Sequence, residues 1–93
     1  MEKVLKNIFD KAIEFFGFDA QCGQFAEEVG ELLAALNQYR RGRIPLANLT
    51  EEIADVQIML EQIKIMFNIK ENDVQKFIDL KLDKLSKKMS EKV

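Results

Sequence analysis

Apolar residues recur three or four positions apart through the first half of the chain, which is the spacing of an α-helix with one buried face. The first such stretch runs from residue 2 to 16, and Gly17 ends it. The second takes Asp19 as its N-cap and extends to about Arg41, with Gly42 just beyond. The first half therefore predicts two helices joined by a short turn.

The second half of the chain also predicts two helices. A third helix is predicted to begin at Asn48, which forms a capping-box-like pair with Glu51, and to continue to about Phe67. A fourth is predicted from about Glu71 to Lys88. No segment shows the period-two alternation of a strand. The predicted fold is all-α, a four-helix bundle in a single domain that spans all 93 residues.

The third predicted helix is apolar on two sides, because Ile58 and Ile65 lie away from Leu60 and Ile63. A helix that is apolar nearly all round is buried on most sides. Four helices of this size do not cover both faces within one chain. We therefore expect self-association, as a homodimer or a homotetramer, to complete the bundle.

Two acidic pairs stand out, Glu28 with Glu31 on the second predicted helix and Glu52 with Asp55 on the third. Residues three apart share one side of a helix, so each pair projects together. An unpaired buried carboxylate is costly, and Glu52 and Asp55 sit on a mostly apolar helix. A divalent cation between the pairs would compensate these charges. A solvated helix start, where the helix dipole favours acids, is the alternative for Glu52.

The connection between these two helices decides whether the acidic pairs can meet. A symmetric hairpin that turns near residue 45 would place Glu52 and Asp55 opposite residues near 36, about seven residues or ~10 Å from the first pair. The chain from Arg41 to Asn48 can span up to ~23 Å when extended. The sequence therefore permits the two pairs to converge.

The acidic pairs and their surroundings resemble the MazG-like, all-α nucleoside triphosphate pyrophosphohydrolases. The resemblance rests on EEVGEL and EEIADV, in which the two pairs are separated by 20 residues, and it extends through YRRGRIPLANL and IMLEQIKIMF. It implies a bundle of the MazG-like type and a Mg²⁺ cofactor, for which Mn²⁺ can substitute. It also implies hydrolysis of a (deoxy)nucleoside triphosphate between the α and β phosphates, to a monophosphate and pyrophosphate. The metal ligands that it implies are Glu28, Glu31, Glu52 and Asp55.

The chain has no histidine, so any catalysis rests on carboxylates, amines and metal. The resemblance makes one acid a general base for water, and Glu31 and Glu27 are the candidates. Gln21 and Gln24 lie upstream of the first pair, one turn apart, and are candidates for a hydrogen bond to the base or sugar. An ordinary polar helix surface explains these two glutamines about as well.

Phosphate binding also calls for cations, and Lys81 is the candidate contact. Members of the family carry a lysine, an asparagine and a basic residue at four- and then three-residue steps near the C-terminus. Lys81 and Lys88 fit that pattern, whereas Leu85 departs from it. For each lysine taken singly, a solvated surface position is the alternative.

Net charge, cysteine content and hydropathy exclude several classes of binding partner. A net charge of −2 and a pI of about 5.2 argue against binding a nucleic acid polymer. One cysteine, Cys22, cannot form an internal disulfide, and no apolar run reaches the ~18 residues that would span a membrane. The N-terminal stretch is amphipathic and does not read as a signal peptide. We expect a cytoplasmic protein with a nucleoside triphosphate substrate and no membrane partner.

The sequence is also compatible with two other functions. A phosphoribosyl-ATP pyrophosphohydrolase shares the same broad fold. A non-enzymatic helical interaction module, whose acids only keep it soluble, belongs to a different class.

Overall fold

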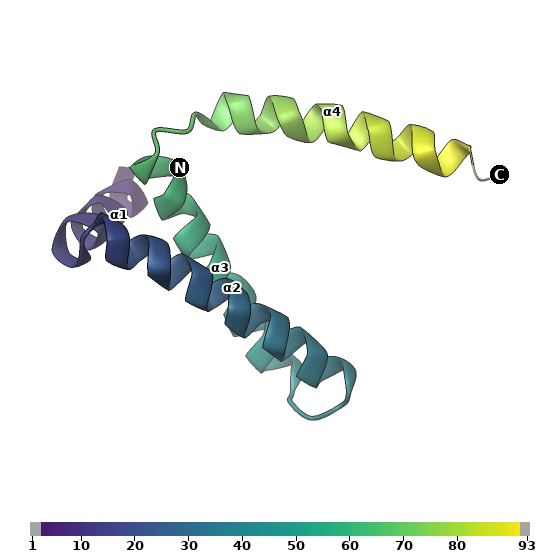
Figure 1. Cartoon of the computed structure of the whole chain (residues 1–93), viewed down its shortest axis with the longest axis horizontal. Coiled ribbons are helices and arrows are strands. Elements are labelled where there is room, and N and C mark those ends of the chain that lie inside the picture. The colour runs from purple at the N-terminus through teal and green to yellow at the C-terminus, as the bar shows by residue number, and fades with distance from the viewer. Residues whose placement is uncertain (1–2, 92–93) are drawn as a thin grey trace.

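The computed structural model describes residues 3–91, which form four α-helices and no strand (Figure 1). The prediction of an all-α fold with four helices is confirmed. The predicted start of the first helix at residue 2 lies outside the described residues. In chain order the helices are α1 Lys3–Phe16, α2 Phe18–Arg40, α3 Leu46–Met66 and α4 Glu71–Ser90.

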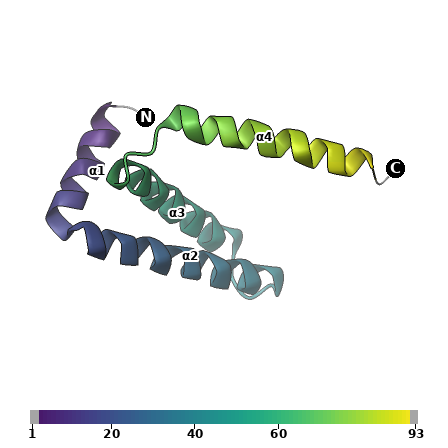
Figure 2. The ribbon, with the colours of Figure 1, turned by 45° about the horizontal axis from the view of Figure 1, so that its top comes forward.

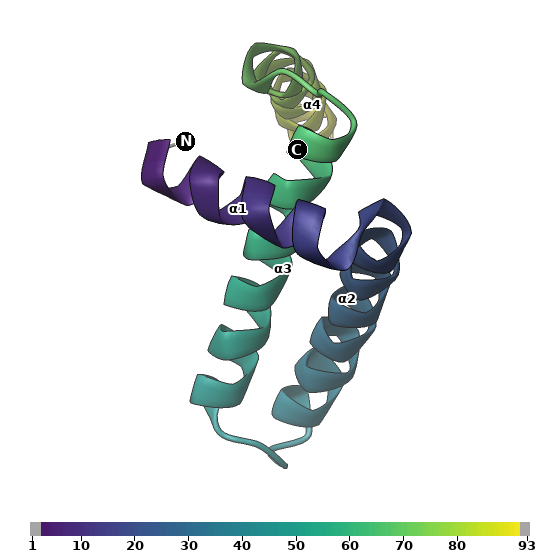
Figure 3. The same ribbon diagram turned by 90° about the vertical axis from the view of Figure 1, so that its left-hand side faces the viewer.

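The two central helices, α2 and α3, lie side by side as an antiparallel hairpin, and α1 crosses the end of the hairpin at which α2 begins (Figures 2 and 3). The contact between α2 and α3 is the most extensive in the chain, and α1 packs on both helices. The buried apolar side chains are few: Phe9 from α1, Ala35 from α2 and Met59 from α3. A core this small leaves much apolar surface uncovered.

A single residue, Gly17, joins α1 to α2. Its φ of 95° lies in the region that favours glycine, and its backbone N–H donates to the Ile13 carbonyl at 2.9 Å. Gly17 itself takes the N-cap position of α2, so Asp19 falls in the first turn and no side chain caps the helix. The predicted capping by Asp19 is therefore wrong, because so short a connection leaves the N-cap to the glycine.

The start of α3 also differs from the prediction. Pro45 occupies the N-cap position in an extended conformation, and the helix begins at Leu46 rather than at Asn48. The Asn48 N–H donates to the Pro45 carbonyl at 3.1 Å, so Asn48 lies in the first turn and no capping box forms with Glu51. Proline has no N–H to lose and a φ suited to this position, which is why the helix starts earlier.

The early start of α3 shortens the connection between α2 and α3 and so changes the hairpin. Gly42, at φ 71°, closes α2 with a Schellman pattern in which Gly42 donates to Tyr39 and Arg43 donates to Gln38. The connection is then centred near residue 43 rather than 45. Residues opposite Glu52 and Asp55 consequently lie near 32, and the expected offset from the first acidic pair falls from about seven residues to about three.

The fourth helix packs against none of the other three (Figure 1). It leaves the end of α3 and runs away from the hairpin, and all its side chains except Val74 are exposed. The radius of gyration is 16.6 Å, whereas a compact chain of this length has about 12 Å. A bundle thus describes α1 to α3, and α4 projects from it. None of the helices in residues 3–91 combines the length and apolar character needed to cross a membrane.

Candidate metal centre

A stripe of mostly polar side chains lies between α2 and α3. On each helix four residues follow one another at steps of three, four and three, which is the spacing of one continuous stripe along a helix. We call these facing residues the seam: Gln21, Gln24, Glu28 and Glu31 on α2, and Glu52, Asp55, Met59 and Gln62 on α3.

One end of the seam is closed by a pair of glutamines. Gln21 Nε2 donates to Gln62 Oε1 at 2.7 Å, and Gln62 Nε2 lies 3.7 Å from the sulfur of Met59. Both glutamines are almost fully buried, with 6% and 4% of their surface exposed. A buried amide pair of this kind fixes the register of the two helices, because any shift would leave both amides without partners. In this antiparallel register Glu28 falls opposite Asp55, and Glu31 opposite Glu52.

The middle of the seam is a cluster of carboxylates. Glu28, Glu31 and Glu52 each offer one oxygen, and the three oxygens lie within 4.8 Å of one another. Asp55 lies close enough to Glu28 for its charge to raise the pKa of the Glu28 carboxyl. Glu28 and Glu52 are half-buried, whereas Glu31 and Asp55 are exposed. The structure thus brings three of the four predicted metal ligands together and places the fourth, Asp55, near Glu28. Glu31 and Asp55 leave this region open to solvent.

The carboxyl of Glu28 lies in an unfavourable environment for a negative charge. Burial raises the pKa of the Glu28 carboxyl above its usual range, and the nearby charges of Glu31 and Asp55 raise this pKa further. A hydrogen bond of 2.8 Å from Gln24 Nε2 to Glu28 Oε1 acts in the opposite direction. The other oxygen of Glu28 is buried and has no hydrogen-bond partner. The folded chain therefore holds Glu28 where a negative charge is poorly compensated.

Glu52 shows the same deficit from the opposite helix, since its Oε2 is also buried without a partner. Within residues 3–91, none of the four acids forms an ion pair with a lysine or arginine. Buried polar atoms are normally satisfied, and each exception calls for an explanation. A cation between α2 and α3 would satisfy both oxygens at once.

The donor set decides which cation fits. Carboxylate oxygens are the ligands of hard cations such as Mg²⁺ and Mn²⁺. The chain has no histidine, and its one cysteine, Cys22, is not among the clustered residues. The cluster therefore suits Mg²⁺ or Mn²⁺ better than zinc or copper.

Of the other predicted site residues, some lie near the acidic cluster and others do not. Gln24 lies beside the cluster through its bond to Glu28, whereas the side-chain amide of Gln21 is directed to Gln62. Glu27 is exposed and is not one of the three clustered carboxylates. Lys81 lies on α4, which the chain does not bring to the hairpin. The roles assigned to these residues remain predictions.

Sequence reasoning missed Gln62, which lies on the seam although most of its helix is apolar. The signal was available in the spacing, because Glu52, Asp55, Met59 and Gln62 repeat the steps of the stripe on α2. Matching the two stripes in antiparallel order would have paired Gln21 with Gln62.

Comparisons of the chain with protein-family models, with curated proteins and with solved structures found no match.

Proposed function

We propose that the chain is a Mg²⁺-dependent nucleotide pyrophosphohydrolase of the MazG-like type. The proposed reaction cleaves a (deoxy)nucleoside triphosphate between the α and β phosphates to a monophosphate and pyrophosphate. The observation that carries the proposal is the acidic cluster across the seam, in which Glu28 and Glu52 each leave a buried oxygen without a partner. The resemblance of EEVGEL and EEIADV to that family supports the choice of reaction.

Four residues would hold the metal: Glu28, Glu31, Glu52 and Asp55. When bound, Mg²⁺ neutralises the charge of a triphosphate and polarises its phosphoryl oxygens. Because two ligands come from each helix, the site would depend on the register that Gln21 and Gln62 fix. Gln24 would hold Glu28 in its orientation through the 2.8 Å hydrogen bond.

The chain must also supply a group that accepts a proton from the attacking water. Glu31 is exposed at the edge of the cluster, so it can take up a proton from water on the open side. Glu27 is the second candidate, one position before Glu28 on α2. In the net reaction water adds to the α phosphorus, the bond from this phosphorus to the bridging oxygen breaks, and pyrophosphate leaves. The enzyme is proposed to work as a homodimer or homotetramer.

A product assay tests the proposal directly. The chain is incubated with Mg²⁺ and a panel of ribo- and deoxyribonucleoside triphosphates, and pyrophosphate, monophosphate and orthophosphate are measured. We expect pyrophosphate and monophosphate in equal amounts, and none when EDTA replaces Mg²⁺. Release of orthophosphate with a diphosphate would contradict the assigned cleavage position.

The same panel separates the alternatives. Release of pyrophosphate only from phosphoribosyl-ATP would assign the chain to that reaction. Turnover of no nucleotide, with either Mg²⁺ or Mn²⁺, would favour an interaction module and contradict an enzymatic function.

A further inference from the structure

The corner between α3 and α4 is built by specific contacts. Asn68 adopts φ 53°, its N–H donates to the Ile65 carbonyl at 3.2 Å, and the Ile69 N–H donates to the Lys64 carbonyl at 2.9 Å. These two bonds form a Schellman pattern, with asparagine in the left-handed position that it tolerates better than most residues. The direction in which the chain leaves α3 is therefore locally specified.

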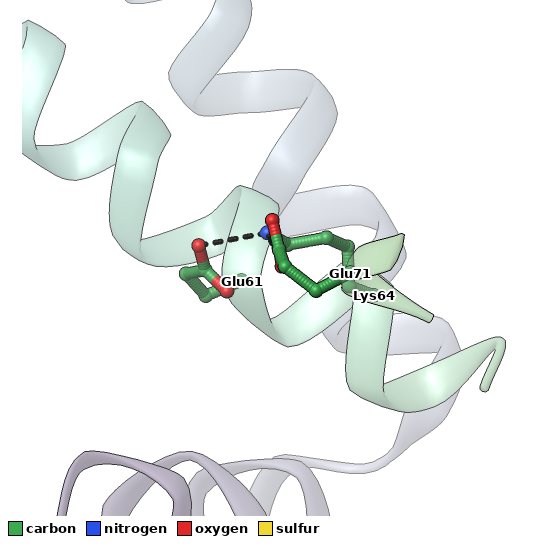
Figure 4. A network of polar contacts seen from close by, with 3 residues as sticks. All are labelled: Glu61, Lys64 and Glu71. Atoms are coloured by element: carbon green, nitrogen blue, oxygen red, sulfur yellow. Dashed lines mark hydrogen bonds and ion pairs between the residues drawn. The ribbon is translucent and has the colours of Figure 1, made fainter. Parts of the chain in front are cut away.

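Ion pairs reinforce this corner. Lys64 Nζ lies 2.9 Å from Glu61 Oε1 on α3 and 2.7 Å from Glu71 Oε2, at the first residue of α4 (Figure 4). The Lys64 side chain is mostly buried, with 14% of its surface exposed. The pair with Glu61 is the better shielded of the two, since the Glu61 side chain is 35% exposed and the Glu71 side chain 69%. The Glu71 pair joins the end of α3 to the start of α4, so it supports the path by which α4 leaves α3.

The helix that the corner projects is amphipathic and presents its apolar side to solvent. We call that side the α4 stripe: Val74, Phe77, Ile78, Leu82, Leu85 and Met89. All but Val74 are among the exposed large apolar side chains of the chain. Leu80 is also exposed but lies on a different side of the helix.

A groove of about 790 Å³ lies beside the start of α4. Its apolar lining comes from Leu5 and Phe9 of α1 and from Ala54, Ile58 and Leu60 of α3, and its polar lining is Gln57, Glu61 and Glu71. Leu5, Ile58 and Leu60 are exposed apolar side chains. The chain thus carries an apolar ridge and an apolar groove that it does not join to each other.

The amount of exposed surface indicates that a second copy of the chain covers both the α4 stripe and the groove. The accessible surface is 7575 Å², whereas a compact monomer of 10.8 kDa exposes about 5,500 Å². The surplus of about 2,000 Å² per chain, or about 4,000 Å² for two chains, is the area that an obligate homodimer buries. A two-fold interface also requires each copy to carry both complementary surfaces, as this chain does.

The charges of α4 argue against a lipid surface as the occupant. The helix carries four acidic residues beside five lysines, whereas helices that lie on anionic membranes are strongly basic. From the corner, the stripe, the groove and the area, we propose that α4 of each copy packs its stripe into the groove between α1 and α3 of a second copy. This exchange joins two chains through two equivalent contacts, and it does not rest on the nucleotide chemistry.

Sedimentation equilibrium of the full chain in EDTA, without nucleotide, tests the exchange apart from the enzymatic proposal. We expect the wild type to have twice the 10.8 kDa mass of one chain at micromolar concentration. Leu82→Glu, in the stripe, should raise the dimer Kd at least about 100-fold, since each dimer loses two buried leucines. Leu80→Glu is the matched control, because Leu80 is as exposed in one chain, at 62% against 57%, but lies off the stripe. Its Kd should change less than about 3-fold.

A mixing experiment tests whether the α4 stripe of one copy contacts the groove of another. Ile58→Glu alters the groove and should weaken the dimer as Leu82→Glu does. A chain with Ile58→Glu keeps its stripe, and a chain with Leu82→Glu keeps its groove, so one of the two contacts can form when they are mixed. We expect the mixture to associate more tightly than either variant alone. Far-UV circular dichroism confirms that every variant is helical.

Four results would overturn the exchange. They are a 10.8 kDa particle for the wild type, a dimer that neither Leu82→Glu nor Ile58→Glu weakens, equal weakening by Leu80→Glu, and no gain on mixing. A monomer that instead binds vesicles of phosphatidylcholine and phosphatidylserine would identify a membrane as the occupant of the stripe.

Discussion

The seam and α4 depart from the usual distribution of polar and apolar residues in opposite directions. The seam places carboxylates and glutamines between two packed helices, where apolar residues are expected. The α4 stripe exposes apolar side chains to water, where polar residues are expected. Both arrangements are unfavourable for an isolated chain.

The two regions differ in the kind of partner that would remove the unfavourable term in each. Glu28 and Glu52 leave buried oxygens that lack positive charge, so a small cation suits the seam. The stripe lacks only apolar cover, so a second protein surface suits α4. The seam is also held by a buried hydrogen bond between helices, whereas α4 is held only at its first residue. A site between two hydrogen-bonded helices is consistent with a ligand centre, and a projecting helix is consistent with an assembly element.

The largest expected effect concerns the acids of the seam. Glu52→Gln and Asp55→Asn should each lower kcat/KM for pyrophosphate release at least about 100-fold, or about 2.7 kcal/mol, because each removes a charged metal ligand. Glu51→Gln is the matched control, since Glu51 precedes Glu52 but is exposed. Steady-state assays of the three variants should leave Glu51→Gln near the wild type. Equal losses in all three would show that general negative charge matters rather than the seam.

The glutamine end of the seam should carry the next largest effect. Gln21→Ala strands the buried Gln62 amide and should lower the free energy of unfolding by about 1–3 kcal/mol. Replacing both residues by leucine removes the stranded groups and should cost much less. Urea unfolding at one protein concentration measures both, with the exposed Gln75→Ala as control. A double-leucine variant as unstable as Gln21→Ala would contradict a paired role.

The α3–α4 corner supplies a smaller effect. At pH 7 Lys64→Met should lower the free energy of unfolding by about 1–2 kcal/mol, because it leaves the part-buried Glu61 without its partner. The ion pairs raise the pKa of Lys64, so its contribution is complete below the ordinary value of 10.5 and is lost only as pH rises above it. Lys6→Met, which breaks an exposed pair with Asp10, is the control and should cost under about 0.5 kcal/mol. Equal losses of stability in Lys64→Met and Lys6→Met would show that the ion pairs of the corner contribute no more than an exposed pair.

The smallest expected effect is a pH dependence at Glu28. A pKa raised in the folded state means that folding favours the protonated carboxyl. Glu28 should therefore make metal-free protein more stable as pH falls from 7 through the folded pKa, with the gain complete below the ordinary value of 4.5. In EDTA the wild type should gain stability relative to Glu28→Gln over this range, and Glu51→Gln should behave as the wild type. A difference that does not change with pH would show that the folded chain does not perturb this carboxyl.

The helices could be predicted from the sequence because periodicity is a property of each segment alone. Their ends could not, because the N-cap at Gly17 and at Pro45 is set by the length and geometry of each connection. Asp19 and Asn48 have the side chains of caps but fall inside the first turns. These small shifts mattered, since the early start of α3 brings the acidic pairs closer in register.

The two acidic pairs could also be predicted from the sequence, because three-residue spacing on a helix decides which side chains project together. Their pairing across the seam depends on the antiparallel register, which the bond between Gln21 and Gln62 supports. The position of α4 was beyond prediction, since the same stripe would suit its own hairpin or another copy. In the structure the contacts of Lys64 and Asn68 at the corner accompany a helix that does not pack on its own hairpin.

Thermal melts in EDTA and in millimolar Mg²⁺ test the metal centre most directly, using the wild type, Glu52→Gln and Asp55→Asn at one protein concentration. The wild type should gain about 2.7 kcal/mol when Mg²⁺ is a hundredfold above its Kd. Both variants should lose most of this gain, yet in EDTA they should be at least as stable as the wild type, because they relieve repulsion among clustered charges. If Mg²⁺ does not raise the melting temperature of the wild type, and both variants melt lower in EDTA, then Glu52 and Asp55 are structural residues and the metal centre is refuted.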